Sequence, residues 1–452
     1  MEDQDFLHNT RLDKSVESSR IRDDIMTLIS KYANDVHTKK SFIPGKTFLP
    51  VSGKVFGERE IQMLTSSALD FWLTTGRFNL EFEKRLAEFL GIRFTITTNS
   101  GSSANLLALS SLTSEHLGDK SLKPGDEVIT VAAGFPTTVN PILQNNLVPI
   151  FIDVKIPEYV IDEELIETNI TEKTKAIMVA HTLGNPFNIK KITDIAKRHG
   201  LWIIEDCCDA LGTMYDEKFV GNFGDLSTLS FYPAHHITMG EGGAVMTNNP
   251  QLKRIVESFR DWGRDCYCEP GISNTCGKRF EWKLGDLPEG YDHKYTYSHT
   301  GYNLKITDMQ ASVGLAQLES LPEFIKTRRD NFKFLYEGIS SLEEFFILPE
   351  ATENSKPSWF GFPIIVKEKD KFSKESLVNY LASKLIDTRP IFAGNLIKQP
   401  YFKNKRFKTS DTLENTEIVM NQSFWIGVFP GLTTDMLEYI VKQFKAFVLE
   451  NK

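Results

Sequence analysis

The sequence predicts an α/β fold, with a mostly parallel seven-stranded sheet covered by helices on both faces and a smaller α+β C-terminal domain. Short apolar runs indicate the strands, at residues 94–99, 127–133, 148–154, 175–181, 201–207, 226–232 and 243–248. Helix-length segments separate the first five runs, and strands that alternate with helices form parallel sheets. After about residue 325 the spacing loosens, which indicates the second, smaller domain.

Length and charge limit the class of protein. The chain has 452 residues, enough for two or three domains, and 41% of them are apolar. The net charge is −8 with acids and bases mixed, which argues against nucleic acid or an anionic membrane as the main partner. No apolar run approaches the ~18 residues of a membrane span, and the polar, acidic N-terminus is not a secretory signal. We expect a cytoplasmic protein.

An N-terminal segment, residues 1–60, precedes the large domain at 61–325 and the small domain at 326–452. Residues 20–33 have helical periodicity, and one face of this helix would carry Ile21, Ile25, Leu28, Ile29 and Tyr32. We expect the helix to dock on another part of the protein. Proline and glycine punctuate residues 42–56, which is typical of an extended arm.

Candidate ligand-binding residues follow the predicted strands, because ligands of such sheets bind beyond the carboxyl ends of the strands. After the first run, Gly101 and Ser102 open an apolar helix. Small residues at a helix N-terminus let backbone N–H groups approach an anion, so this turn is a candidate phosphate site. The alternative is an ordinary strand-to-helix turn with a serine cap.

Two more side chains stand at strand ends. Asp206 closes the fifth run, where a carboxylate can keep a pyridinium nitrogen protonated, although it could simply cap a helix. Phe135 follows the second run, where a ring could stack on a heteroaromatic ligand or belong to the core.

Together these segments resemble the DegT/DnrJ/EryC1/StrS family of sugar aminotransferases and dehydratases, from about residue 50 to the C-terminus. The shared stretches, in the family's order, are WLTTG (72–76), the Gly-Ser turn, IIED (203–206), SFYP (230–233), GEGGAV (240–245) and GYNLKITDMQASVGLAQLE (301–319). The resemblance implies a fold-type-I architecture that uses pyridoxal phosphate (PLP). It also implies a homodimer with active sites at the subunit interface.

The resemblance assigns roles by position. Gly101 and Ser102 would hold the cofactor phosphate with help from Ser230, and Phe135 would stack on the ring whose nitrogen Asp206 pairs. Asn303 would reach the phosphate from the neighbouring subunit. Asp209 is a candidate cofactor contact that departs from the family, since many relatives have Gln or His there in contact with the ring hydroxyl. The 72–76 stretch and Arg389 are candidate contacts to a sugar nucleotide.

His235 stands five residues after Ser230, where the family has the lysine that binds PLP covalently. Histidine can shuttle protons near neutral pH but forms no stable Schiff base. The expected cofactor is therefore pyridoxamine phosphate (PMP), which brings its own amine, with His235 as the base at C4′. On a 4-keto sugar this chemistry expels the 3-hydroxyl group. A degraded site in an inactive relative is the alternative, and His236 is a weaker candidate base.

The cysteines indicate a metal site. A loop-like insert at about 262–296 contains Cys266, Cys268 and Cys276. Three thiols in eleven residues suggest a metal-binding loop, for zinc or an iron–sulfur cluster. With Cys208 they match C-x57-C-x-C-x7-C, the pattern of the branch that dehydrates CDP-4-keto-6-deoxyglucose. That branch carries a 2Fe–2S cluster beside the histidine. The fifth cysteine, Cys207, is expected to be a small buried residue.

The branch resemblance implies further partners. A flavin and iron–sulfur reductase that uses a nicotinamide cofactor would supply electrons through the cluster for 3-deoxygenation of the CDP-sugar. The product would feed 3,6-dideoxyhexoses of bacterial surface polysaccharide. Three rivals remain: a cluster-free GDP-4-keto-6-deoxymannose 3-dehydratase, an ordinary sugar aminotransferase, and a zinc-stabilised nucleotide-sugar-binding protein without catalysis.

Overall fold

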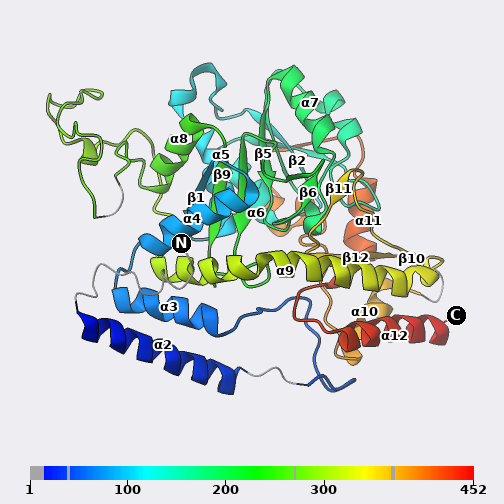
Figure 1. The fold of residues 1–452 in the computed structure, drawn as a ribbon. Coiled ribbons are helices and arrows are strands. Elements are labelled where there is room, and N and C mark those ends of the chain that lie inside the picture. Colours follow the sequence, from blue (N-terminus) through cyan, green and yellow to red (C-terminus); the bar gives the residue numbers. More distant parts are fainter. Residues whose placement is uncertain (1–14, 38–40, 269–270, 368–371, 452) are drawn as a thin grey trace.

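The computed structural model describes residues 15–37, 41–268, 271–367 and 372–451 (Figure 1). The acidic N-terminal stretch, which is not expected to be a secretory signal, lies almost wholly outside these residues. Within the described segments, no helix combines the length and the apolar character that crossing a bilayer requires.

The central sheet confirms the predicted fold class. Its strand order is β1-β9-β8-β5-β4-β2-β3-β13, and only β9 runs antiparallel to its neighbours β1 and β8. Its strands are β1 (Phe94–Thr98), β2 (Glu127–Val131), β3 (Val148–Ile152), β4 (Thr174–Ala180), β5 (Trp202–Asp206), β8 (Leu226–Ser230), β9 (Gly243–Thr247) and β13 (Lys408–Thr409). Each of the seven predicted runs forms one strand. The eighth, β13, comes from the C-terminal part, where two residues pair with β3 and carry too little pattern to be predicted.

Helices cover both faces because successive side chains of a strand point to opposite sides. On one side Val128, Met178 and Ile204 pack with helices α5 (Gly101–Ser111) and α8 (Pro250–Arg260). On the other side Ile129, Ile177 and Ile203 pack with α4 (Arg77–Leu90), α7 (Ile189–His199) and the long α9 (Asp308–Ile339). Helix α6 (Pro136–Gln144) follows β2. The sheet is therefore buried on both faces, as a parallel sheet requires.

The C-terminal part has its own antiparallel sheet, β10-β12-β14, and a separate core. Its elements are β10 (Phe346–Ile347), β12 (Gly361–Val366), α10 (Lys374–Ser383), α11 (Glu414–Gln422), β14 (Ser423–Gly427) and α12 (Thr434–Glu450). A third small sheet joins β6 (Met214–Tyr215), β7 (Lys218–Phe219) and β11 (Ser355–Lys356). Helix α9 runs through the predicted boundary at 325/326: Ile325 packs in the large core and Phe332 in the small one. The boundaries therefore stay a prediction.

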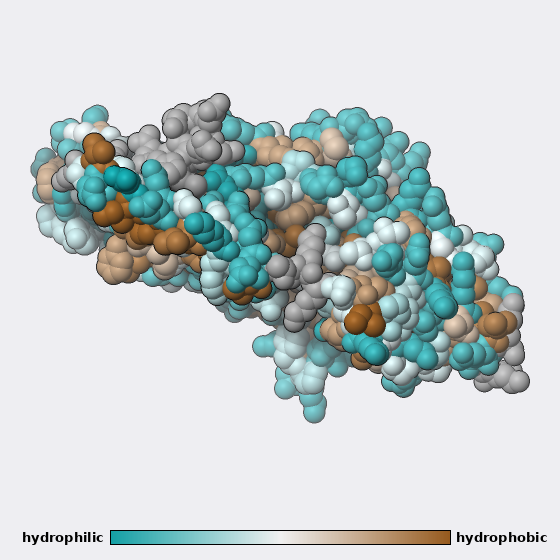
Figure 2. All heavy atoms as spheres, turned by 60° about the horizontal axis from the view of Figure 1, so that its bottom comes forward, coloured by the Kyte–Doolittle hydropathy of each residue, from teal (hydrophilic) through white to brown (hydrophobic). Residues whose placement is uncertain are grey.

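The N-terminal helix α2 (Val16–Val36) docks on α3 (Glu58–Asp70), but the predicted docking face is wrong. Arg22, Met26 and Ala33 are buried, whereas Ile21, Leu28 and Tyr32 of the apolar stripe are exposed. The reason is polar: the Arg22 guanidinium donates to Ser66 Oγ and to Asp70, both at 3.0 Å, which turns this face inward. Figure 2 views the molecule with this lower side brought forward and shows apolar patches among the polar surface.

Candidate cofactor site

A cavity of about 650 Å³ opens at the carboxyl edge of the sheet. Its lining brings together most of the residues singled out from the sequence: Gly101, Ser102, Phe135, Asp206, Cys208, Asp209, Ser230, His235 and Arg389. They come from the ends of β1, β2, β5 and β8 and from the C-terminal part. Asn303 and residues 72–76 are not among the lining residues.

The turn between β1 and α5 satisfies both sequence interpretations. Ser100 caps the helix, because its Oγ accepts a hydrogen bond from the Ser103 amide at 3.1 Å. The cap leaves the first helical amides, Gly101 and Ser102, at the cavity wall without helical partners. A Cβ at Gly101 would lie 2.4 Å from the Ser230 Cβ, so only glycine lets the helix N-terminus approach β8 this closely. The turn therefore offers free donors to an anion.

Asp206 is a buried carboxylate held in one orientation. Its Oδ2 accepts hydrogen bonds from Asn105 Nδ2 at 2.8 Å and from Thr138 Oγ1 at 2.7 Å. Its Oδ1 accepts one from the Cys208 amide at 3.1 Å. It caps no helix, so the capping alternative is wrong. These three hydrogen bonds hold the Asp206 carboxylate in one orientation. In that orientation it can accept a hydrogen bond from a ring nitrogen of a ligand in the cavity.

Phe135 is not a core residue. Its side chain is 50% exposed, at the N-terminus of α6, and its ring meets Phe392 edge-to-face with 5.9 Å between centroids. An aromatic ring that lines a cavity and is held on one side only is available for stacking on a planar ligand.

His235 and Asp209 form a neutral pair at the cavity wall. His235 Nδ1 lies 3.5 Å from Asp209 Oδ1. Burial lowers the pKa of His235 to about 4, against the opposing attraction of Asp206. Burial also raises the pKa of Asp209 to about 8, and repulsion from Asp206 adds to that shift. At neutral pH the imidazole is therefore uncharged, so a ring nitrogen is free to accept a proton, but in this unliganded cavity it is a weaker base than an ordinary histidine.

His236 lies outside this cavity. It is buried, and its Nε2 pairs with the backbone oxygen of Ser358 at 2.8 Å. Burial holds the pKa of His236 well below its usual range. This residue supports the loop and does not face the cavity.

Arg328 is a candidate positioning residue that sequence reasoning missed. It lies on α9, is only 1% exposed, and donates to the backbone oxygens of Trp359, Phe360 and His235 at 3.2, 3.4 and 3.2 Å. No carboxylate among the described residues pairs with it, and burial lowers its pKa to about 9. A buried unpaired guanidinium is costly. An arginine inside a helical pattern gives no sign of this burial.

The four cysteines of the spacing pattern do not gather in one place. Cys208 lines the 650 Å³ cavity, whereas Cys266 and Cys268 line a separate cavity of about 270 Å³ beside α8, and the two cavities share no lining residue. Cys276 lies farther along the insert, which projects beyond α8 away from the sheet in Figure 1. The described part of one chain therefore does not fit four thiolates around one cluster.

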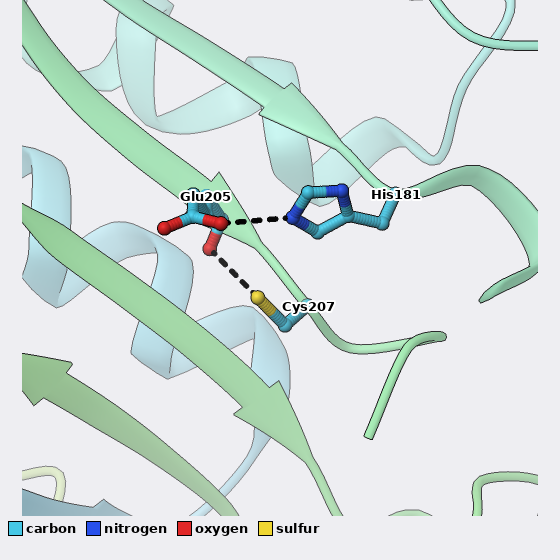
Figure 3. Close-up of side chains that lie close together, drawn as sticks. All are labelled: His181, Glu205 and Cys207. Carbon is cyan, nitrogen blue, oxygen red and sulfur yellow. Dashed lines mark hydrogen bonds and ion pairs between the residues drawn. The ribbon is translucent and has the colours of Figure 1, made fainter. Parts of the chain in front are cut away.

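The compact set of metal-ligand types found among the described residues is a different one, His181, Glu205 and Cys207 (Figure 3). Glu205 accepts hydrogen bonds from the amides of residues 221, 223 and 224, and it pairs with His181 Nε2 at 3.1 Å. These bonds fix the turn beside β5. Cys207 is buried, as expected, and the set is a structural one.

Comparison with known proteins places the chain in a family. The model of the DegT/DnrJ/EryC1/StrS aminotransferase family matches residues 55–445. The chain belongs to this family. The match leaves α2 outside the shared region.

Two relatives match almost the whole chain. It is 60% identical to the lipopolysaccharide biosynthesis protein RfbH of Salmonella typhimurium, over 95% of this chain and 98% of that protein. It is 49% identical to the dTDP-4-dehydro-2,6-dideoxy-D-glucose 3-dehydratase of Saccharopolyspora spinosa, over 95% and 93%. Among solved structures, an E. coli GDP-4-keto-6-deoxy-D-mannose-3-dehydratase with bound hydrated PLP has a TM-score of 0.79 at 26% identity. That match covers 88% of this chain and 99% of the other.

Proposed function

We propose that the protein is a PMP-dependent dehydratase that removes the 3-hydroxyl group of a 4-keto nucleotide sugar. The observation that carries the proposal is the cavity itself: an anion turn, a fixed carboxylate and a stacking ring surround His235, and no lysine is among the lining residues. Relatives named as sugar 3-dehydratases support the same chemistry.

The residues present fit the cofactor. Gly101 and Ser102 would bind its phosphate, Phe135 would cover the ring, and Asp206 would meet the ring nitrogen. When bound, PMP supplies an amine for the sugar ketone and a ring that accepts electrons. The uncharged His235 imidazole would take the proton from C4′. Asp209 lies beside this imidazole, with its Oδ1 3.5 Å from His235 Nδ1.

We further propose CDP as the nucleotide, a homodimer, a 2Fe–2S cluster on the four cysteines, and a flavin and iron–sulfur reductase as the electron donor. Resemblance to the branch with this cysteine spacing supports the nucleotide, the cluster and the reductase, and resemblance to the whole family supports the homodimer. When present, the cluster would supply single electrons for completing 3-deoxygenation. The separation of the cysteines within one chain favours the cluster-free GDP-sugar dehydratase as the second candidate.

Oxygen exchange tests the proposed function. Protein with PMP and CDP-4-keto-6-deoxyglucose in ¹⁸O-water should place ¹⁸O at carbon 3, because elimination of the 3-hydroxyl group is reversible. Exchange only with the GDP-4-keto-6-deoxymannose substrate would assign the rival. If PMP binds and neither sugar exchanges, the dehydratase assignment is wrong.

Gly101→Ala should weaken PMP binding at least ~10-fold, measured by equilibrium dialysis. The new Cβ would lie 2.4 Å from Ser230 Cβ, so α5 or β8 must shift and the free amides leave the phosphate position. Gly57→Ala is the control, because a Cβ there meets nothing within 4 Å. Equal affinity in both variants would contradict the phosphate role of this turn.

Arg328→Met should slow dehydration by ~10-fold or more and leave PMP affinity nearly unchanged. The substitution removes the hydrogen bond to the backbone oxygen of His235, and a small misplacement of a reacting group greatly lowers the reaction rate. Arg329→Met is a matched control. The neighbouring Arg329 donates to the backbone oxygens of Pro357, Gly212 and Lys356, each at 3.0 Å, and touches no residue of the histidine loop. Equal rates in the two variants, at equal thermal stability, would show that Arg328 only supports the fold.

A further inference from the structure

The cavity of about 270 Å³ beside α8, here called the insert cavity, has a wall of charged side chains that the proposed dehydration does not use. It lies between α8 and the insert, and it shares no lining residue with the cofactor cavity. Two antiparallel bridges, Asp261–Asn303 and Arg264–Tyr297, hold the base of the insert in place beside it. Sites for drug-sized ligands measure about 300–1,000 Å³, so a ligand of this cavity would be small.

The three carboxylates that line the insert cavity each have a basic partner already. The pairs are Glu257 with Lys253 at 2.8 Å, Asp261 with Arg260 at 2.9 Å and Asp265 with His293 at 3.2 Å. Lys305 adds a second cation, 3.5 Å from Asp261. These pairs leave no carboxylate of the wall for the other two arginines that line the cavity.

Those two arginines are Arg254, on α8, and Arg264, in the turn after it. In the described part of the chain, neither guanidinium has a hydrogen bond or an ion pair, and each lies over an aromatic ring instead. Arg254 is 4.7 Å from the Tyr267 centroid, and Arg264 is 4.9 Å from the Trp262 centroid. Nε of Arg264 is also buried without an acceptor among these residues. A buried donor without a protein acceptor costs free energy and is typical of a group that binds a ligand.

We infer that the insert cavity binds a phosphate group between Arg254 and Arg264. A guanidinium that stacks on a ring through its face keeps its N–H edge free, and that edge matches the oxygens of a phosphate. Each guanidinium carries five N–H donors, so two of them suit a phosphate dianion better than a single carboxylate. The inference does not depend on the proposed dehydration, because the two cavities are separate.

Hydrogen exchange, measured by mass spectrometry, tests the inference on the full chain with PMP in excess, so that PMP occupies the phosphate turn of the cofactor cavity. Inorganic phosphate is the probe. It should slow exchange in peptides that cover residues 251–268, and titration calorimetry should give a dissociation constant on the order of 1 mM or tighter. Arg254→Gln and Arg264→Gln should each weaken this binding by ~10-fold or more, since each removes charge-assisted hydrogen bonds.

Arg93→Gln is the matched control. Arg93 also lies over a ring, 4.8 Å from the Phe94 centroid, but it does not line the insert cavity, so its loss should leave phosphate binding unchanged. Full binding in both cavity variants, or an equal loss in the control, overturns the inference. Binding that the arginine variants keep and Cys266→Ser loses would place the anion on a metal at the cysteines, which also overturns it.

CDP is the second probe and distinguishes the sources of the phosphate group. If CDP slows exchange in the same peptides at lower concentration than phosphate, and Arg264→Gln abolishes this effect, the ligand is the terminal phosphate of a nucleotide. If only inorganic phosphate slows exchange there, the ligand is the free anion.

Discussion

His235→Asn is expected to lose dehydration by ~10²-fold or more while still binding PMP, because asparagine keeps a similar size but cannot accept the C4′ proton. The rate is measured by ¹⁸O exchange at carbon 3, and cofactor content by absorbance. The uncharged state of the buried imidazole is what makes it a base at neutral pH.

His236→Asn is the matched control. That histidine is buried against the Ser358 oxygen and outside the cavity, so its loss should disturb stability more than the reaction. Normal exchange in His235→Asn together with loss in His236→Asn would move the role of base to the neighbour.

His235→Lys tests independently whether residue 235 lies close to C4′ of the cofactor. A lysine at this position should bind PLP covalently, with a new absorption band that borohydride abolishes. The absence of this band in a folded variant would mean that the loop does not bring residue 235 to C4′.

Cys266→Ser or Cys268→Ser is expected to remove the iron–sulfur absorption and to abolish net 3-deoxygenation with reductase and reduced nicotinamide. A hydroxyl group is a poor iron ligand in place of a thiolate. Dehydration should persist, because elimination moves electrons within the substrate and cofactor and needs no external donor.

The control is Cys207→Ser, a buried position outside the spacing pattern, which should keep both absorption and deoxygenation. If wild-type enzyme releases the 3-deoxy-4-keto sugar without any reductase, with an amino acid regenerating PMP, the electron-transfer role is wrong. The GDP-type rival then takes its place.

The sequence by itself determined the strands of the sheet and most of the cavity wall. Continuous apolar runs such as 127–133 become strands because a parallel sheet buries both faces, and residues after those runs meet because parallel carboxyl ends share one edge. This rule predicts the cavity wall at the carboxyl edge of the sheet, where the structure has Gly101, Phe135, Asp206 and His235.

Only the tertiary structure decided the rest. Arg22, and not the apolar stripe, turns the face of α2 inward, and Arg328 is drawn into the core to hold the histidine loop. Neither arginine differs in sequence pattern from a solvated one, since burial depends on partners distant in the chain. The spacing of the four cysteines likewise does not determine whether they lie together in space. In the fold, Cys208 follows β5, and two strands, β9 and β8, separate β5 from the edge strand β1.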